Sequence, residues 1–543
     1  MYLDIIFKVV GGLGIFLYGM DNMSGGMQKL AGKKLKKILA ALTTNRFIAI
    51  FMGFFVTMLV QSSSVSTVMT IGFVNASLLT LEQGLGVILG ANIGTTVTGW
   101  LLVLHLGKFG LPIAGIAAII FVFVKKDRSK TKALTLMGFG LIFLGLELMS
   151  TGLEPIRSMP EFLNLFKLFV ADSYFGAFKA ALVGACITAL VQSSSATLGI
   201  TITLALQGLI DYPTAVALVL GGNVGTTITA FLATLNASTN AKRAAYAHSI
   251  INIFGVCWVI SIFPYYLKVL NLVVDSKDNI TIGIATAHTM FNILNVLFFT
   301  PFIGPLSRLL KILVKDNGKM DNKVTKLDAL MVATPGVVVG QTKIEILTMG
   351  QYIKEMLFTL EEIYAKQKEM SEKKIERLQH VEDSLDLYQK EITDVNFMIL
   401  NKDLSNNLIE ETRKNLEICD EYETISDYCL RIAKALKKIQ DNDIELTEVE
   451  RNILFKLNES TELLFREVNI SFEEKDRERF LKAIIKADKI TSDFKRARAY
   501  HLKNASQAGV PVMLSTGYMD ILNYYRRIRD HLFNIIEVFS RLQ

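Results

Sequence analysis

Long apolar stretches alternate with short polar loops from residue 5 to residue 310, and from about residue 315 the chain becomes rich in charged residues. A membrane-spanning helix needs roughly 20 mostly apolar residues. Segments that meet or approach this length are 3–20, 81–104, 111–124, 133–149, 213–235, 244–267 and 280–302. The first is read as a retained helix, because it lacks the basic start and the cleavage site of a signal peptide. The pattern predicts an all-α, polytopic membrane domain over residues 1–314 and a soluble domain after it.

Two further apolar regions, 47–79 and 178–210, are each interrupted at the centre by four polar residues. The interrupting residues are Gln61, Ser62, Ser63 and Ser64 in the first region and Gln192, Ser193, Ser194 and Ser195 in the second. Unpaired polar groups in hydrocarbon cost several kcal/mol each, so these groups must face protein or water. We expect each region to return to its own side of the membrane as a re-entrant hairpin.

The two interrupted regions belong to an internal repeat. Residues 53–98 align with residues 184–229 at a constant shift of 131, with identical residues at 18 of 46 positions, where chance gives roughly three. A second shared motif is Asn92, Thr95 and Thr96, matched by Asn223, Thr226 and Thr227. Each copy is expected in the middle of a helix that opens with a plausible N-cap, Thr80 or Asp211. A weaker match, shifted by 126, pairs Ser24 with Ser150 and extends the repeat to the first helix. The chain therefore divides into repeat one, about 1–124, repeat two, about 133–268, and a final helix, about 280–302.

Basic residues suggest the orientation of the two repeats. They cluster in two predicted loops, at Lys29, Lys33, Lys34, Lys36 and Lys37 and at Lys125, Lys126, Arg128, Lys130 and Lys132. Short basic loops stay in the cytoplasm. The first helix then runs inward and its copy, 133–149, runs outward, so the halves are inverted and the soluble domain is cytoplasmic. Inverted repeats with broken segments are typical of secondary transporters, although a duplicated channel or structural protein is the alternative.

The net charge of +7 raises the question of nucleic acid as a partner. The clusters of positive residues are explained by membrane topology, so no nucleic acid is expected. The four cysteines have no spacing that suggests a disulfide framework or a zinc site.

The chemistry of the interruptions favours an anion together with a cation. A helix that begins at such a point exposes N–H groups at the positive end of its dipole, which with serine hydroxyls can hold phosphate. Carbonyl, amide and hydroxyl oxygens form a neutral shell that suits Na⁺. No series of acidic residues crosses the apolar core, which disfavours proton coupling. The alternative is that these Gly, Ser and Thr residues only pack helices together.

Two similar strings, Ala247-His248-x-x-x-Asn252 and Ala287-His288-x-x-x-Asn292, lie near the start of apolar segments. We expect both histidines to be buried hydrogen-bonding groups rather than proton carriers.

The paired Gln-Ser-Ser-Ser motifs, each followed by Asn-x-Gly-Thr-Thr at equal distance, resemble the type II sodium/phosphate cotransporter family over about residues 11–304. The resemblance implies sodium-driven phosphate uptake, with substrate and ions bound between two re-entrant hairpins. The binding residues that it implies are Gln61, Ser62, Ser63, Ser64, Asn92, Thr95 and Thr96 in one half and Gln192, Ser193, Ser194, Ser195, Asn223, Thr226 and Thr227 in the other.

Beyond a polar linker, 315–326, residues 327–543 resemble a PhoU-like helical domain. Asp328 and the pair Thr334-Pro335 are expected at helix starts. The resemblance implies a regulatory bundle whose paired carboxylates bind a divalent metal or an iron cluster. Here these would be Glu382 with Asp386 and Glu423 with Asp427, because a four-residue spacing puts each pair on one helix face. Arg526 replaces an acid in the later copy, so only one site is expected, and a solvated charged face is the alternative.

We therefore expect a sodium-coupled phosphate symporter of the cytoplasmic membrane, with sodium, phosphate and membrane lipid as its partners. Its PhoU-like half would support a homo-oligomer or bind a cytoplasmic regulator. Rival hypotheses are a phosphate sensor without net transport, a carrier of another oxyanion, and proton coupling. An enzyme is disfavoured, because no nucleophile with a base and no phosphate-binding glycine loop is recognisable.

Overall fold

The computed structural model describes residues 2–40, 45–104, 107–159, 169–235, 237–275, 279–315, 323–365, 372–402, 404–474, 477–505 and 510–540. Every regular element in these ranges is helical, as expected from the sequence. Contacts divide the chain into two compact units. The first contains residues 1–321 and 328–337, and the second contains residues 322–327 and 338–543.

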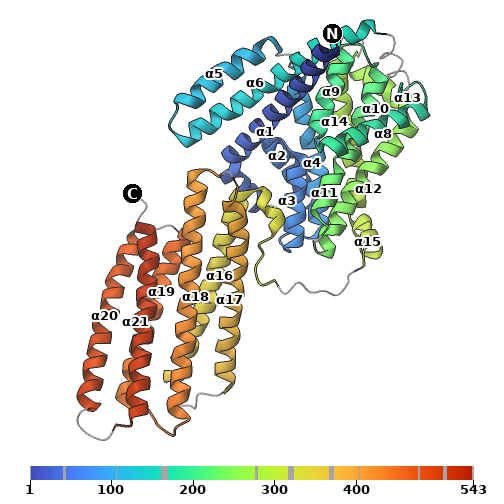
Figure 1. The fold of residues 1–543 in the computed structure, drawn as a ribbon. Coiled ribbons are helices and arrows are strands. Elements are labelled where there is room, and N and C mark those ends of the chain that lie inside the picture. The colour runs from blue at the N-terminus through green and yellow to red at the C-terminus, as the bar shows by residue number, and fades with distance from the viewer. Residues whose placement is uncertain are drawn as a thin grey trace. The chain divides into compact units, whose positions relative to one another are not determined.

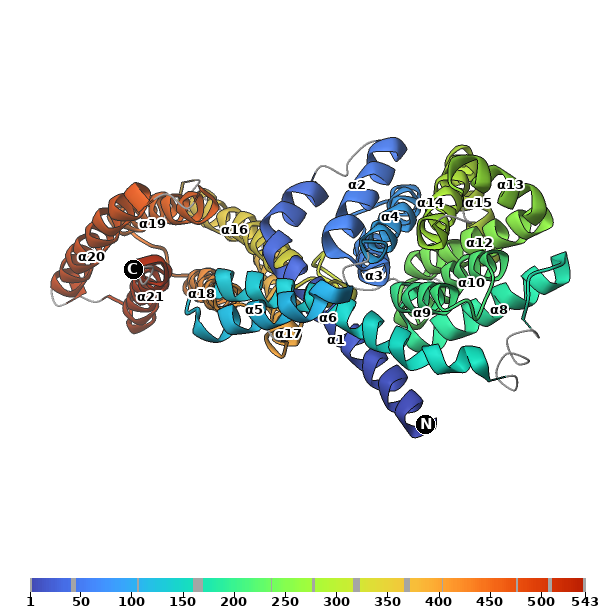
Figure 2. The ribbon, with the colours of Figure 1, turned by 90° about the horizontal axis from the view of Figure 1, so that it is seen from above.

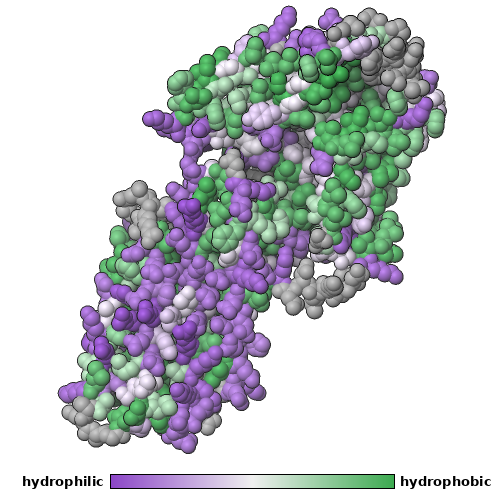
Figure 3. All heavy atoms as spheres, in the orientation of Figure 1, coloured by the Kyte–Doolittle hydropathy of each residue, from purple (hydrophilic) through white to green (hydrophobic). Residues whose placement is uncertain are grey.

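The first unit is built from apolar helices (Figure 1). They are α1 (Tyr2–Ala40), α2 (Arg46–Val60), α3 (Ser63–Asn75), α4 (Leu81–Leu102), α5 (Gly107–Phe123), α6 (Asp127–Leu153), α8 (Tyr174–Val191), α9 (Ser194–Leu206), α10 (Tyr212–Gly225), α11 (Thr227–Ala233), α12 (Thr239–Ser261), α13 (Phe263–Val273), α14 (Ile280–Phe299) and α15 (Ile303–Leu313). Seven described helices are long and apolar enough to span a membrane. Apolar side chains cover much of the visible face of this unit (Figure 3), so it is a multi-pass membrane domain.

One expectation about the apolar stretches needs correction. Helix α1 continues to Ala40, so the first basic cluster, predicted as a loop, lies within a helix. Its Lys, Leu and Ala residues are strong helix formers, which explains the extension. The stretch at 111–124, expected to approach the length of a span, forms α5, whose 17 residues place it among the shorter apolar helices.

Glycines allow the helices of this unit to pack at backbone distance. Helices α1 and α6 lie side by side (Figures 1 and 2), and a Cβ atom on Gly19 would stand 2.8 Å from the Gly138 carbonyl oxygen. In the first half, a Cβ on Gly90 of α4 would lie 1.8 Å from the Ile50 carbonyl oxygen on α2. In the second half, a Cβ on Gly221 of α10 would lie 1.7 Å from the Ala181 carbonyl oxygen on α8. Gly90 and Gly221 correspond in the repeat, so both halves use the same close contact.

A short segment before the second unit folds onto α3. Asp328 caps the 3-10 helix η3 (Ala329–Ala333), and its carboxylate accepts a hydrogen bond from the Asn75 amide at the end of α3. The Asn75 side-chain oxygen, Oδ1, in turn accepts from the backbone N–H of Ser238, 2.8 Å away, at the start of α12. Met331 is fully buried. The segment therefore ties the ends of α3 and α12 together.

The second unit is a bundle of long helices (Figure 1). They are α16 (Pro335–Ala365), whose first turn belongs to the first unit, α17 (Glu372–Leu400), α18 (Asn406–Gln440), α19 (Glu448–Glu474), α20 (Arg477–Ala505) and α21 (Val512–Ser540). Each helix has an apolar side turned inward, and Tyr422, Tyr518 and Tyr525 are among the fully buried side chains of the bundle. The predicted helix starts at Asp328 and Pro335 are confirmed.

Candidate binding site at the two helix breaks

Both interrupted regions break at the predicted residues and with the same backbone geometry. Gln61 ends α2 at φ 56° and ψ 26°, and Gln192 ends α8 at φ 55° and ψ 24°. Both lie in the left-handed region, which is unfavourable for a residue with a side chain. Such a conformation persists only where its surroundings hold it, and it is common at functional sites.

The first serine after each break serves as a helix cap. The Ser62 hydroxyl accepts a hydrogen bond from the Val65 N–H at 3.3 Å, and the Ser193 hydroxyl accepts from the Ala196 N–H at 3.2 Å. Within the described chain, the next two serines of each half have no hydrogen-bond partner for their N–H groups or hydroxyls; these are Ser63, Ser64, Ser194 and Ser195. Each helix therefore presents free donors at the positive end of its dipole, which suits an anion.

The threonines of the second motif are arranged alike in the two halves. Thr95 donates to the Ala91 carbonyl at 3.0 Å, and Thr226 donates to the Gly222 carbonyl at 2.9 Å. Thr96 and Thr227 donate to carbonyls three residues earlier, and all four side chains are buried. Because only their protons are used, the hydroxyl oxygens keep lone pairs that can bind a cation.

The helices that carry the second motif match most of the predictions made from the sequence. Thr80 and Asp211 cap the helices that carry it, as predicted. The motif was predicted to lie in the middle of a helix in both halves. That holds for α4, which is continuous, whereas in the second half the helix is interrupted at Thr226, between α10 and α11.

Two asparagines outside the predicted set hold the motif asparagines in place. The Asn92 side-chain amide donates to the Asn252 Oδ1 atom at 3.5 Å. The Asn223 Oδ1 atom lies 3.3 Å from both the His288 Nε2 atom and the Asn292 side-chain amide nitrogen. His248 and His288 are buried, and hydrogen bonding of His288 is as expected. The repeated Ala-His-x-x-x-Asn string was the signal that could have placed Asn252 and Asn292 at the site.

The structure brings elements of the two halves together. Helix α4 of the first half packs on α9 of the second, and α11 of the second half packs on α3 of the first. A Cβ on Gly99 of α4 would touch Leu198 of α9 and His288 of α14. Within the described chain, no hydrogen bond joins one Gln-Ser-Ser-Ser motif directly to the other.

The predicted metal ligands gather on α17 and α18 of the second unit. Burial and the nearby carboxylates of Asp386, Asp383 and Asp427 raise the pKa of Glu382 to about 6. Asp427, however, forms an ion pair with Arg431 at 2.7 Å. Among the residues that the structure describes, no group of three His, Cys, Asp or Glu side chains is arranged to hold a metal ion. The metal centre expected at Glu382, Asp386, Glu423 and Asp427 therefore has no support in this geometry.

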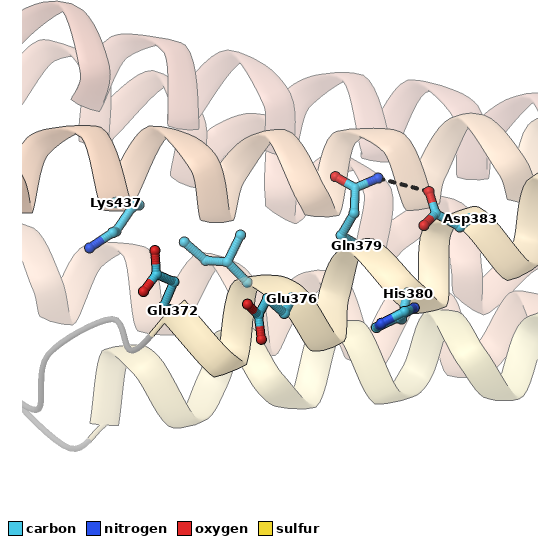
Figure 4. Close-up of a pocket in the computed structure, with 7 residues that line it drawn as sticks. Glu372, Glu376, Gln379, His380, Asp383 and Lys437 are labelled. Atoms are coloured by element: carbon cyan, nitrogen blue, oxygen red, sulfur yellow. Dashed lines mark hydrogen bonds between the residues drawn. The ribbon is translucent and has the colours of Figure 1, made fainter.

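Two grooves run along these helices. One, of about 570 Å³, is lined by Asp386, Asp420 and Glu423 together with Lys390. The other, of about 400 Å³, is lined by residues of α17 and by Lys437 of α18 (Figure 4). It contains none of the four predicted ligands, and its Gln379 amide donates to Asp383 at 3.0 Å. Both grooves combine acidic residues with a lysine, as a solvated charged face would.

The crowding of these carboxylates predicts a pH-dependent stability. The pKa of Glu382 is raised from 4.5 to about 6 in the folded bundle. The stabilising contribution of this side chain to the free energy of unfolding is therefore fully present below about pH 4.5 and is lost as the pH rises through about 6. Glu382→Gln should therefore raise the temperature at which the bundle opens at pH 8 and leave it unchanged near pH 4.5. Opening can be followed by labelling the buried Cys419 and Cys429. Glu410→Gln, at an exposed position, is the control, and an equal gain at both pH values would contradict the prediction.

Comparisons with known proteins agree with the membrane architecture. The profile of the family described as "Na+/Pi-cotransporter" matches residues 15–151 and 163–269. "Putative inorganic phosphate export protein YjbB" of Escherichia coli (strain K12) is 25% identical over 360 residues, which cover 66% of this chain and 65% of that protein. The chain thus spans slightly less than two thirds of that relative's length. No solved structure matches.

Two further relatives match shorter parts of the chain. "Uncharacterized protein YqeW" of Bacillus subtilis is 29% identical over 299 residues, 55% of this chain and 95% of that protein. Human "Sodium-dependent phosphate transport protein 2B" is 35% identical over 98 residues, 18% of this chain and 14% of that protein. The names of the E. coli and human relatives both refer to the movement of phosphate. The N-terminal half of the chain is thus a membrane domain of the Na+/Pi-cotransporter family.

Proposed function

We propose that the chain moves inorganic phosphate across the cytoplasmic membrane, coupled to sodium, by alternating access at the two helix breaks. The observation that carries this proposal is the matched pair of helix starts, in which Ser63 and Ser64 correspond to Ser194 and Ser195. Each start presents free N–H and hydroxyl donors in an otherwise apolar unit. Two such starts can share the oxygens of one phosphate ion.

Sodium compensates the charge of the bound phosphate. Among the described lysines and arginines of the membrane unit, Arg243 is the one that is buried, and its guanidinium donates to the Val314 carbonyl at 2.7 and 3.0 Å. The anion would therefore be held by dipoles and hydroxyls. Threonine oxygens and glutamine carbonyls of the same motifs supply neutral ligands for Na⁺. The family match of the N-terminal half supports this coupling.

The two halves act as inverted repeats in this proposal, with α2–α3 and α8–α9 as re-entrant hairpins. Their equal backbone geometry and the equivalent glycine contacts support the pairing. The C-terminal bundle would be the PhoU-like, cytoplasmic regulator of the transporter.

The direction of net transport separates two candidates. The name of the human relative refers to sodium-dependent transport, which favours uptake driven by the inward sodium gradient. The name of the E. coli relative refers to phosphate export, which favours efflux through the same site. Both use the same chemistry at the breaks and differ in which gradient drives the cycle.

Labelled phosphate in proteoliposomes tests the proposal. Gradients of Na⁺, K⁺ or protons are imposed in turn, inward and outward, on empty vesicles and on vesicles loaded with phosphate. Accumulation that requires an inward sodium gradient supports symport, whereas loss from loaded vesicles without accumulation supports export. Saturable phosphate binding with no movement in either direction would contradict transport and support a phosphate sensor. Sulfate as a competitor tests the choice of oxyanion.

A further inference from the structure

The two breaks have the same sequence and backbone, but their side chains are in different states. At the first break, the Gln61 side chain is buried, with 6% of its surface exposed. Its amide donates to the Met58 carbonyl at 2.6 Å, and its carbonyl oxygen accepts from the Thr98 hydroxyl at 3.0 Å. The Ser24 hydroxyl of α1 covers the same point by donating to the Val60 carbonyl at 2.8 Å. The first break is therefore closed.

The second break lacks every one of these contacts. Gln192 is exposed, and within the described chain no group hydrogen-bonds to its side chain. Thr229, which corresponds to Thr98, donates instead to the Thr226 carbonyl of its own helix at 2.9 Å. Ser150, which corresponds to Ser24, accepts a hydrogen bond from Gln207. The second break is therefore open, although its residues could make the same contacts.

The valines beside the two glutamines report the same difference. Val60 is fully buried, whereas Val191 is partly exposed. In each half, the hydroxyl at the equivalent position, Thr98 or Thr229, can donate a hydrogen bond either to a carbonyl of its own helix or to the glutamine side chain. Because the same kinds of hydrogen bond are exchanged, both arrangements satisfy the buried polar groups.

We infer that Thr98 and Thr229 are positioning residues that close the two breaks in turn. This inference rests on the proposed function, because it assigns the exchange to alternating access. In the state described here, the Thr98 hydroxyl occupies the Gln61 carbonyl oxygen, and the Gln192 carbonyl oxygen is free to bind Na⁺. In the opposite state, Thr229 holds Gln192 and the Gln61 oxygen is free. Each glutamine then binds the ion only while its own break is open.

Cysteine labelling tests the exchange without measuring transport. In chains whose exposed Cys186 and Cys257 are replaced by serine, a single cysteine is placed at Val60 or at Val191 and labelled with a membrane-impermeant maleimide. Thr98→Val should raise the labelling rate at position 60 and lower it at position 191, each about fivefold, as expected for loss of one hydrogen bond. Thr229→Val should change both rates in the opposite directions. Thr98→Ser and Thr229→Ser keep the hydroxyl, so these chains should be labelled at the same rates as the chains with unchanged Thr98 and Thr229.

Sodium and phosphate kinetics provide the second readout. Thr98→Val and Thr229→Val should change the apparent affinity for sodium in opposite directions, whereas a merely structural role would lower only the amount of active protein. If both substitutions move the two labelling rates in the same direction, or move neither, the inference is overturned. Should Thr98→Val fail to fold, Thr229→Val decides, because Thr229 is only partly buried and bonds within its own helix. Opposed labelling changes in a chain that moves no phosphate would overturn the proposed function alone.

Discussion

Chains carrying Ser63→Leu or Ser194→Leu are expected to reach the membrane in normal amounts and to move no phosphate above the background of empty vesicles. Each substitution removes a hydroxyl from the free donors of a helix start and fills the space in front of its N–H groups. The caps at Ser62 and Ser193 remain, so α3 and α9 still begin at the same residues. Measured uptake and efflux in proteoliposomes, normalised to inserted protein, give the result.

A matched control separates the site from a general effect of leucine in a membrane helix. Ser261→Leu lies at an exposed position at the end of α12 and should transport as the unchanged chain does. Ser63→Ala and Ser194→Ala, which add no bulk, should reduce transport less than leucine does. Normal phosphate movement by both leucine variants would show that the breaks are not the binding site.

Gly90→Ala and Gly221→Ala are expected to prevent stable folding of the membrane unit. In each case the new methyl group would stand less than 2 Å from a backbone carbonyl oxygen, at 1.8 Å for Gly90 and 1.7 Å for Gly221. A backbone atom cannot turn aside as a flexible side chain can, so two helices must separate. Overpacking of this kind costs roughly 1–3 kcal/mol and sometimes more. The monodisperse fraction after detergent extraction and the temperature of thermal aggregation measure the effect.

Gly115→Ala in α5 is the control for this pair, because a Cβ there would meet no atom within 4 Å. Alanine is the better helix former, so this change should be neutral or slightly stabilising. Loss of folding in all three variants would mean that glycine is needed for reasons other than the contacts between α2 and α4 and between α8 and α10.

Much of the candidate site could be predicted from local sequence. Polar residues inside an apolar membrane segment allow few backbone structures, so the breaks at Gln61 and Gln192 were predicted at the correct residues. Capping side chains at Thr80 and Asp211 act within one turn and were also predicted. The end of α1 is not predicted correctly, because short basic segments are typical of cytoplasmic loops although lysine favours helices.

Features that depend on distant contacts were not predicted. Asn252 and Asn292 meet their partners only after helices far apart in the chain have packed. The difference between Gln61 and Gln192 cannot follow from two copies of one motif, since identical sequences do not specify which of two states each copy adopts. The start of η3 at Asp328 was predicted, but its packing on α3 was not, because the contact with Asn75 joins residues far apart in the chain.

The place of η3 decides where the membrane unit can be separated from the rest of the chain. The ten residues 328–337 follow the linker in the sequence but fold with the first unit. A chain severed at residue 314, just after α15, would leave Asn75 without Asp328 and would uncover the apolar cluster around Ile71, on which Leu330 packs. A chain severed after residue 337 keeps both contacts. We expect the longer fragment to be purified as a monodisperse protein and the shorter one to aggregate.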